Sequence, residues 1–341
     1  MDIRDVQPRD SFTIARAGNE NEAFPAPVIQ PRRPMPYPNG WFALCFSEEL
    51  KRRDIRIVPF MGHELVVYRT AGGEAHAVEP YCPHLGAHLG HGGKVDGEAL
   101  VCPFHGLAFG PDGACIHAPN GRPPRAALTK WLTRECNHVV MVWRDSAGRP
   151  PSWEIPDVDT GNGFSSPSRI VEFHDGYSHD AIENSADVLH FAHLHGFTVV
   201  SMTHEVGESS IVVDFTCQYR GVPVTIHFTN YGVNCLIATS TAPGLGVTVL
   251  SKIFTTPTAP LKWTMRVANS VRVARLSSLP DWLLKPINTI LTALADRWTM
   301  GNARQDDPIW NHRNFLTHSK LIEGEASMAA FRRWMKQFYP D

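Results

Sequence analysis

Two short cysteine–histidine pairs, Cys82-Pro83-His84 and Cys102-Pro103-Phe104-His105, constrain the fold of this chain more than any other feature. Each pair offers one thiolate and one imidazole, and seventeen residues separate His84 from Cys102. Two thiolates and two imidazoles can hold a two-iron, two-sulfur cluster, with the cysteines on one iron and the histidines on the other. Such clusters accept and release one electron at a time. The sequence therefore predicts a protein that moves single electrons.

Zinc is the main alternative, because cysteine and histidine also bind it tetrahedrally. Structural zinc sites more often pair their ligands across two to four residues, as in C-x-x-C, and a C-x-H arm fits them poorly. Glycine is frequent in or beside both loops, where it lets backbone N–H groups approach cluster sulfurs; the glycines are Gly86, Gly90, Gly92, Gly93 and Gly106. These features favour the iron–sulfur interpretation.

Composition narrows the class of protein further. The chain has 341 residues, which suits two domains, and its formal net charge of −2 offers no basic excess for nucleic acid. Five cysteines outside the two pairs show no disulfide rhythm, which fits a reducing cytoplasm; they are Cys45, Cys115, Cys136, Cys217 and Cys235. The first 22 residues lack the apolar core of a signal peptide, and no run reaches eighteen apolar residues. We therefore expect no membrane span.

Local patterns divide the chain into four parts. Residues 1–39 form a proline-rich extended arm, and residues 40–150 read as short β runs separated by turns, which indicates a small all-β domain. Residues 151–168 are a linker rich in proline, glycine and serine. Residues 169–341 mix helical and strand patterns and predict a curved antiparallel sheet packed against helices. The expected fold class is α+β.

Three segments of the last part carry the clearest periodicity. A helix is expected from about His179 to His195, with Gly196 as its terminating glycine. Alternating apolar residues at Val224, Ile226 and Phe228 predict a half-buried strand. Apolar residues at helical spacing between Leu283 and Leu294 predict an amphipathic helix.

The histidine-rich helix is a candidate for a second metal site. His190, His193 and His195 lie among apolar residues, and buried imidazoles need partners, of which metal is a common one. A solvated polar helix face is the alternative. Two histidines and one carboxylate form the facial triad of non-heme Fe(II) oxygenases. His190 and His193 share a helix face more easily than His190 and His195, unless His195 lies at a frayed end beside Gly196.

The two cysteine–histidine loops, YCPHLGAHLG from residue 81 and CPFHG from residue 102, resemble the Rieske motif of ring-hydroxylating oxygenases. Within that family, the chain is similar to the branch that contains 3-ketosteroid 9α-hydroxylase oxygenases and Rieske-type cholesterol 7-desaturases. One departure is Leu107, where many relatives carry tryptophan. The resemblance implies an N-terminal Rieske domain and a C-terminal helix-grip (START-like) catalytic domain. It also implies a [2Fe–2S] cluster bound by Cys82, His84, Cys102 and His105, and a mononuclear Fe(II) ion.

The resemblance also assigns roles in the second site. The family pattern N-x-x-D-x-x-H-x4-H falls on Asn184, Asp187, His190 and His195, which makes the two histidines iron ligands. A stretch similar to the family's Gln-Asp-x-x-Ile-Trp makes Asp306 the third ligand. Its neighbour Asp307, before Pro308, reads as a helix N-cap.

Asp187 and Asn184 belong to the catalytic machinery by the same resemblance. Asp187 is expected to bridge the iron ligand His190 to the cluster ligand His105 of a neighbouring subunit. A cluster and an iron held in separate domains of one chain would lie far apart, so the resemblance implies a head-to-tail cyclic homotrimer.

The implied activity is that of a terminal oxygenase that uses O₂ and two electrons to oxidise a C–H bond. Hydroxylation is the expected reaction, and a hydrophobic polycyclic or steroid-like compound is the expected substrate. No G-x-G-x-x-G follows a predicted strand, so NAD(P)H must act through a ferredoxin, a ferredoxin–NAD(P)H reductase or both. Desaturation, oxidative demethylation, oxidative cyclisation of a natural product and non-catalytic electron transfer stay open. The expected cavity walls are apolar residues of the sheet and the helix, namely Phe215, Val224, Ile226, Phe228 and 283–294.

Overall fold

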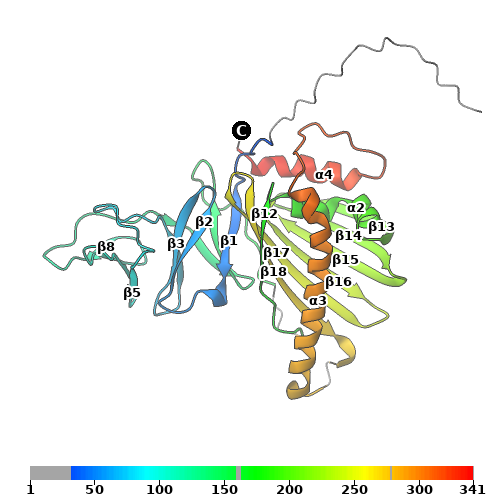
Figure 1. Ribbon diagram of the computed structural model, residues 1–341, viewed down its shortest axis with the longest axis horizontal. Coiled ribbons are helices and arrows are strands. Elements are labelled where there is room, and N and C mark those ends of the chain that lie inside the picture. The colour runs from blue at the N-terminus through cyan, green and yellow to red at the C-terminus, as the bar shows by residue number, and fades with distance from the viewer. Residues whose placement is uncertain (1–31, 159–162, 277–278, 341) are drawn as a thin grey trace, which may run out of the picture. The chain divides into compact units, whose positions relative to one another are not determined.

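The computed structural model describes residues 32–158, 163–276 and 279–340, and from Arg33 onward the chain forms one compact unit. Most of the predicted arm, residues 1–31, and part of the predicted linker, residues 159–162, lie outside the described residues. The described chain forms four antiparallel sheets with helices beside the largest one (Figure 1). Among the helices described, none is long and apolar enough to cross a lipid bilayer.

Three small sheets come from the first half of the chain, as the short β runs predicted. The first has the order β1-β11-β10, the second β2-β3-β4-β9 and the third β5-β6-β7-β8. Their strands are β1 Gly40–Phe46, β2 Ile55–Phe60, β3 His63–Arg69, β4 Ala75–Val78, β5 Lys94–Asp96, β6 Ala99–Val101, β7 Ala108–Phe109, β8 Cys115–His117, β9 Lys130–Trp131, β10 Thr133–Cys136 and β11 Val139–Arg144.

Strands β1 and β11 are apolar without alternation because both of their faces are buried. One face carries Phe42 and Val140 into a core shared with Leu65 of β3. The opposite face carries Trp41 and Met141 into a second core that includes residues of the large sheet. These two strands therefore join the small sheets to the second half of the chain, and the Asn39 backbone N–H adds a hydrogen bond of 2.6 Å to the carbonyl of Phe338.

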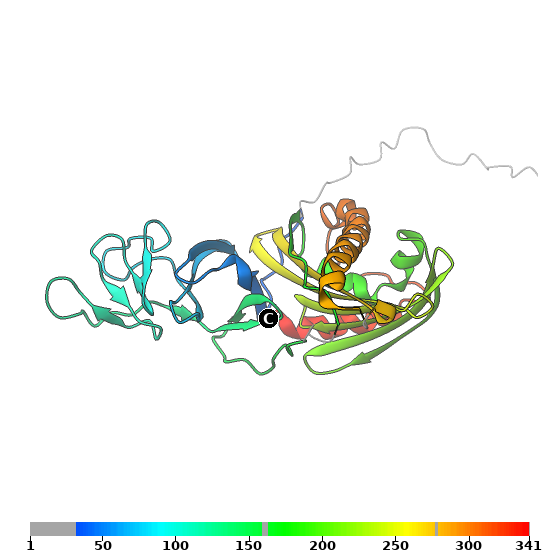
Figure 2. The same ribbon diagram turned by 90° about the horizontal axis from the view of Figure 1, so that it is seen from below.

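The fourth sheet has seven antiparallel strands in the order β12-β18-β17-β16-β15-β14-β13. It curves around a long helix, α3, which lies across its concave face (Figure 2). The strands are β12 Ile170–Asp175, β13 Phe197–Val206, β14 Ser210–Tyr219, β15 Val222–Tyr231, β16 Cys235–Ala242, β17 Val247–Ala259 and β18 Lys262–Val273. Alternation in β15 buries Ile226 and Phe228, as predicted for a half-buried strand. The α+β class with a curved antiparallel sheet is confirmed.

Helix α3 spans Asp281–Trp310 and is much longer than the predicted amphipathic segment. The prediction that Asp307 caps a new helix before Pro308 is wrong, because α3 continues through both residues. The Asp307 carboxylate lies instead 3.1 Å from Nδ1 of the buried His174. A second helix, α4 (Ala326–Met335), precedes the 3-10 turn η4 (Lys336–Phe338) and buries Phe331 in the same core as the sheet residues.

The single helix predicted for residues 179–195 is also wrong. The segment is divided into α1 (Asp180–Glu183), the 3-10 turn η2 (Asn184–Ala186) and α2 (Val188–His193). The break falls at Asp187, whose extended backbone (φ −96°, ψ 95°) lets its side chain act as the N-cap of α2. Its Oδ1 accepts hydrogen bonds from the N–H groups of Leu189 at 3.1 Å and His190 at 3.2 Å.

Candidate metal centres and substrate cavity

The two cysteine–histidine loops share one backbone conformation. The Cys82 N–H donates to the carbonyl of Ala87 at 2.8 Å, and the Gly86 N–H donates back to the Cys82 carbonyl at 2.9 Å. The second loop repeats both bonds, with Cys102 as donor at 2.8 Å and Gly106 at 3.1 Å. Both glycines adopt left-handed conformations, with φ of +73° and +69°, which a side chain would disfavour.

This shared turn places the cysteines inside and the histidines outside. Cys82 and Cys102 are each 2% exposed, whereas His84 and His105 lie on the surface with ring centroids 4.8 Å apart. Burial raises the pKa of the Cys82 thiol, and the neighbouring Cys102 adds to the rise, so a bound cation would be needed to hold Cys82 as the thiolate. The residues fit a [2Fe–2S] cluster with an inner cysteine-bound iron and an outer histidine-bound iron.

A second group of ligands lies between the large sheet and α3. One ligand atom each from His190, His195 and Asp306 lies within 4.8 Å of the others. The closest pair is His195 Nε2 and Asp306 Oδ2 at 3.4 Å. Two ligands of one ion, each bonded at about 2.1 Å, lie at most about 4.2 Å apart. Small side-chain rotations would therefore bring all three onto one ion, and two imidazoles with one carboxylate match the donor set that Fe(II) takes in oxygenases.

The tautomer of His190 leaves one ring nitrogen for metal. Its Nδ1 donates to the backbone carbonyl of Asp187 at 2.6 Å, which leaves Nε2 without a proton. Burial lowers the pKa of His190, although the charges of Asp187 and Asp306 oppose this change. The neutral imidazole that binds a metal is therefore the favoured form.

The position at which α2 ends decides which histidine lies beside His190 as the second candidate metal ligand. His193 is the last residue of α2 and is exposed, whereas His195 follows the helix and is 8% exposed. The ring centroids of His190 and His195 lie 5.0 Å apart. The helix ends before His195, and Gly196 takes φ +69°, so the chain turns the His195 ring inward. The spacing of five residues, awkward on one regular helix, is accommodated in this way.

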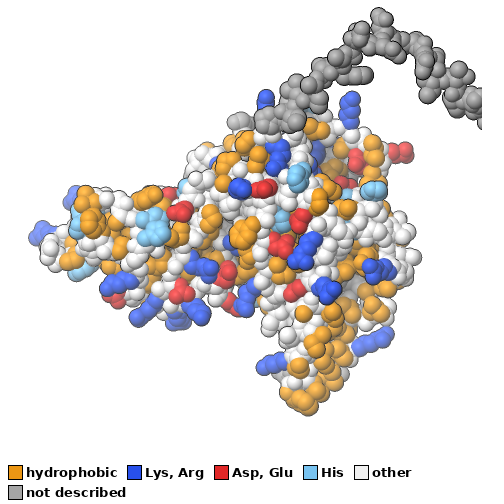
Figure 3. All heavy atoms as spheres, viewed as in Figure 1, with side chains coloured by type: hydrophobic (Ala, Val, Ile, Leu, Met, Phe, Trp, Pro, Cys, Tyr) orange, Lys and Arg blue, Asp and Glu red, His pale blue; other side chains and the backbone are white. Residues whose placement is uncertain are grey.

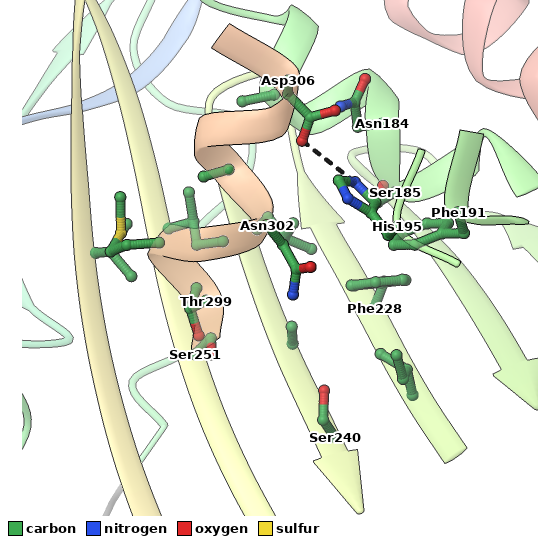
Figure 4. A pocket seen from close by; sticks show the side chains of 18 of the residues that line it. Asn184, Ser185, Phe191, His195, Phe228, Ser240, Ser251, Thr299, Asn302 and Asp306 are labelled. Carbon is green, nitrogen blue, oxygen red and sulfur yellow. Dashed lines mark ion pairs between the residues drawn. The ribbon is translucent and has the colours of Figure 1, made fainter. Parts of the chain in front are cut away.

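The two remaining predicted residues flank this group. Asn184, in η2, lines the same cavity and lies at the end of it that holds His195 and Asp306 (Figure 4). Asp187 is half-buried, and both of its side-chain hydrogen bonds use Oδ1. Its Oδ2 accepts no hydrogen bond from the part of the chain that the structure describes, and it is therefore free for a partner.

A cavity extends from the three ligands along the concave face of the sheet (Figure 4). The space between its walls is about 830 Å³ with the open mouth included. The walls are mainly apolar and come from the sheet, from the second half of α3 and from the segment 181–195. The apolar residues include Phe191, Phe197, Ile226, Phe228, Leu236, Ile253, Met265, Val267, Trp298, Met300 and Trp310.

The predicted walls were only partly right. Ile226 and Phe228 line the cavity, but Phe215 and Val224 do not, and the helical wall comes from Trp298 onward instead of residues 283–294. The sequence did not reveal this because the first half of α3 carries the more regular apolar spacing, whereas Trp298, Met300 and Trp310 lie among polar residues. The register of α3 on the sheet decides which half faces the cavity.

A buried charge network behind α1 was not predicted either. Glu183, Arg313 and Arg332 meet there, with N–O distances of 2.6 and 2.8 Å from the arginines to the carboxylate. Burial alone would raise the pKa of Glu183, but the hydrogen bond from Arg332 and the charge of Arg313 lower it to about 2. Long separations in sequence hide such a network from pattern analysis.

Comparison with known proteins places these features in one class. Residues 40–148 match the Rieske [2Fe-2S] domain, and residues 142–339 match the 3-ketosteroid 9alpha-hydroxylase C-terminal domain. The sea urchin (Hemicentrotus pulcherrimus) protein "Cholesterol 7-desaturase nvd" is 30% identical over 89% of this chain and 70% of its own length. The "3-ketosteroid-9-alpha-monooxygenase, oxygenase component" of Rhodococcus rhodochrous is 23% identical over 97% of this chain and 88% of its own length.

A solved structure shares the fold. It is the Pseudomonas putida CBB5 NdmA QL mutant with theobromine, which covers 87% of this chain and 89% of its own, with a TM-score of 0.68 and 17% sequence identity. The fold and both domain matches define a Rieske-type oxygenase, an oxidoreductase that uses O₂ with a [2Fe–2S] cluster and Fe(II). More narrowly, the chain belongs to the family that carries the 3-ketosteroid 9α-hydroxylase catalytic domain.

Proposed function

We propose that this oxygenase is the terminal component of a multicomponent system and hydroxylates a C–H bond of a polycyclic, steroid-like substrate. The observation that carries the proposal is the apolar cavity, whose inner end holds His190, His195 and Asp306. The substrate classes in the names of the relatives, cholesterol and 3-ketosteroid, support a sterol or steroid as the occupant.

The proposed chemistry needs three protein ligands and a dry cavity. His190, His195 and Asp306 would hold Fe(II), which with three protein ligands keeps open positions where O₂ is activated. Phe191, which packs against His195 at a ring distance of 5.8 Å, and the other apolar walls exclude water from that end. The walls also hold the rigid substrate so that one carbon faces the metal.

Polar groups away from the metal would orient the substrate. Asn302 and Thr299 project from α3 into the middle of the cavity, and Ser240 lies at its far end (Figure 4). The Thr299 hydroxyl is buried and finds no hydrogen-bond partner within the described residues. A buried polar group left unpaired is costly, and a ligand oxygen would satisfy it. We infer a substrate that carries a hydroxyl or keto oxygen on an otherwise apolar skeleton.

Electrons are proposed to reach this site from a neighbouring copy. His105 is exposed, and Oδ2 of Asp187 is free within the described chain, so each offers one half of a hydrogen bond between subunits. A cyclic homotrimer would make that bond at every interface. The electrons would come from NAD(P)H through a ferredoxin, a reductase or both, in the cytoplasm.

Desaturation is the second candidate, and the cholesterol 7-desaturase relatives favour it. Both reactions begin at a C–H bond facing the same metal, and they differ in product. Incubation with a small sterol and steroid panel, a surrogate reductase and ¹⁸O₂ separates them. Hydroxylation adds one labelled oxygen, whereas desaturation removes two hydrogens without label. If the enzyme converts none of the polycyclic compounds although both metal sites are loaded, the proposed substrate class is refuted.

The metal assignment has its own test. The ligand sets predict about three irons per chain, two in the cluster and one mononuclear. Asp306→Asn should reduce the count to about two and leave the cluster's EPR signal unchanged, because the cluster ligands lie on separate loops. His193→Ala is the matched control, since His193 is the exposed histidine of the same segment. Loss of the mononuclear iron in the His193→Ala variant would contradict the assignment of His195.

A further inference from the structure

The outward face of the first half of α3 is apolar and uncovered by the described chain. Trp282, Ile290 and Leu294 are 72%, 62% and 57% exposed. These residues and the exposed Pro286 are spaced by multiples of four, so they form one stripe along the helix. Hydrophobic side chains gather over this end of α3 (Figure 3). A solvated helix face normally carries polar residues, so a stripe of this length marks an interaction site.

The stripe ends abruptly. After Leu294 the stripe does not continue, and polar residues, namely Arg297, Arg304 and Gln305, make up half of the exposed residues of α3. Trp298, one turn beyond Leu294, is the first α3 residue that lines the cavity. Four residues of helix correspond to about 6 Å, so the stripe begins where the cavity wall ends.

Positive charge surrounds the stripe. Lys285 and Arg297 are exposed on α3, and Arg275 is exposed in the preceding 3-10 turn η3 (Ala274–Leu276). Arg275 reaches the Gly244 carbonyl at 3.5 Å, in the β16–β17 hairpin. The next residue of that hairpin, Leu245, is 55% exposed and adds to the apolar surface.

The carboxylate of Asp296, which lies on the same part of α3, does not neutralise these cations at the surface. Asp296 accepts hydrogen bonds from Ser168 Oγ at 2.7 Å and Asn269 Nδ2 at 2.9 Å, which hold it against the sheet. Figure 3 likewise shows Lys or Arg side chains on both sides of the apolar end of α3 and no acidic side chain among them on this face. Among the side chains that the structure describes, the patch is therefore an apolar stripe with three cations around it.

We propose that this patch binds the surface of an anionic lipid bilayer. A helix that lies on a bilayer inserts an apolar face and presents basic residues to the headgroups, and tryptophan prefers that interface. The stripe, which includes Trp282, and the three cations around it match this arrangement. Because the patch adjoins the cavity, an apolar substrate could pass from the bilayer to the metal site. This last step rests on the proposed function, whereas membrane binding does not.

Sedimentation with vesicles tests the proposal on the full-length holoenzyme. We expect the protein to sediment with phosphatidylcholine vesicles that contain phosphatidylglycerol, and much less with phosphatidylcholine alone or in high salt. The variant Ile290→Gln/Leu294→Gln should bind the anionic vesicles about tenfold more weakly or worse, because it removes two side chains that insert. Leu316→Gln/Ile322→Gln, at two equally exposed apolar residues outside α3, should bind like the unaltered protein.

Three results would overturn the proposal. One is that the unaltered protein does not sediment with anionic vesicles. Another is that both double variants bind equally well. The third is that Ile290→Gln/Leu294→Gln changes the molar mass measured by light scattering and leaves vesicle binding intact, which would make the stripe a contact between copies of the chain. None of these results depends on turnover, so failure here leaves the proposed oxygenase reaction untouched.

Discussion

At the scale of single residues, Asp187 uses its two carboxylate oxygens differently. Oδ1 caps α2 and thereby fixes His190, while Oδ2 is free within the described chain. Asparagine is as good an N-cap as aspartate, whereas alanine costs about 1 kcal/mol at such a position. We expect Asp187→Asn to keep both metal sites and the unfolding midpoint but to lose coupled turnover. Asp187→Ala should lose turnover and also about 1 kcal/mol of unfolding free energy.

Iron content, denaturant unfolding and the ratio of product to NAD(P)H consumed distinguish the two roles. Asp187→Asn with normal coupling would show that the negative charge of Asp187 is not needed for electron transfer. Equal unfolding free energies for the two variants would show that the cap contributes nothing.

Residue types and their spacing were enough to predict the cluster ligands, because each short loop carries its own pair. They were not enough to choose between His193 and His195. That choice depends on the break at Asp187 and on the helix ending at His193, so His195 turns inward. An aspartate before an apolar helical run is an N-cap signal, so the break itself could have been predicted.

At the scale of elements, the buried Glu183 network ties α1 to α4 and to the chain after α3. Arg332 bonds Glu183 and also lies over the Phe315 ring at 5.1 Å, whereas its neighbour Arg333 is exposed. We expect Arg332→Ala to lower the free energy of unfolding by about 2–3 kcal/mol, because it removes a charged hydrogen bond from a buried carboxylate. Arg333→Ala, on the same helix, should change it by less than about 0.5 kcal/mol. Similar denaturant midpoints for the two variants would contradict a stabilising network.

The same region predicts a dependence of stability on pH. Burial lowers the pKa of His179 from 6.5 to about 4, and Tyr339 Oη lies 2.8 Å from its Nδ1. Between these two values the unfolded chain binds a proton that the folded chain does not, so stability falls as pH drops through this window. His179→Gln, which cannot titrate, should show a shallower fall in melting temperature over the same pH range. Parallel curves for the two proteins would mean that His179 does not contribute.

At the scale of the whole molecule, the fold class could be predicted, whereas the wall that α3 contributes to the cavity could not. Strand alternation and helical spacing are local, and they indicated the all-β first half of the chain, the strand around Val224–Phe228 and the first half of α3. Which half of α3 lines the cavity is decided by packing across the concave face, and the half with the more regular apolar spacing is not the one that does so. The same ambiguity hid the exposed stripe from Trp282 to Leu294. The sequence alone therefore attributed to the cavity a part of α3 that does not line it and that includes the exposed Ile290 and Leu294.

The association of chains is the largest-scale prediction. The cluster loops lie at the end of the small sheets away from the seven-stranded sheet (Figures 1 and 2), so one chain does not bring cluster and cavity together.

If electrons cross between subunits, a chain without a cluster can accept them from a neighbour that lacks only the mononuclear iron. Co-expression of Cys102→Ser and Asp306→Asn chains should therefore restore activity that neither variant has alone. In a randomly mixed head-to-tail trimer about one interface in four joins an intact cluster to an intact iron site, so about a quarter of normal turnover is expected. Variants mixed after purification, without subunit exchange, are the control. An inactive co-expressed trimer that contains both chains would show that each chain feeds its own iron.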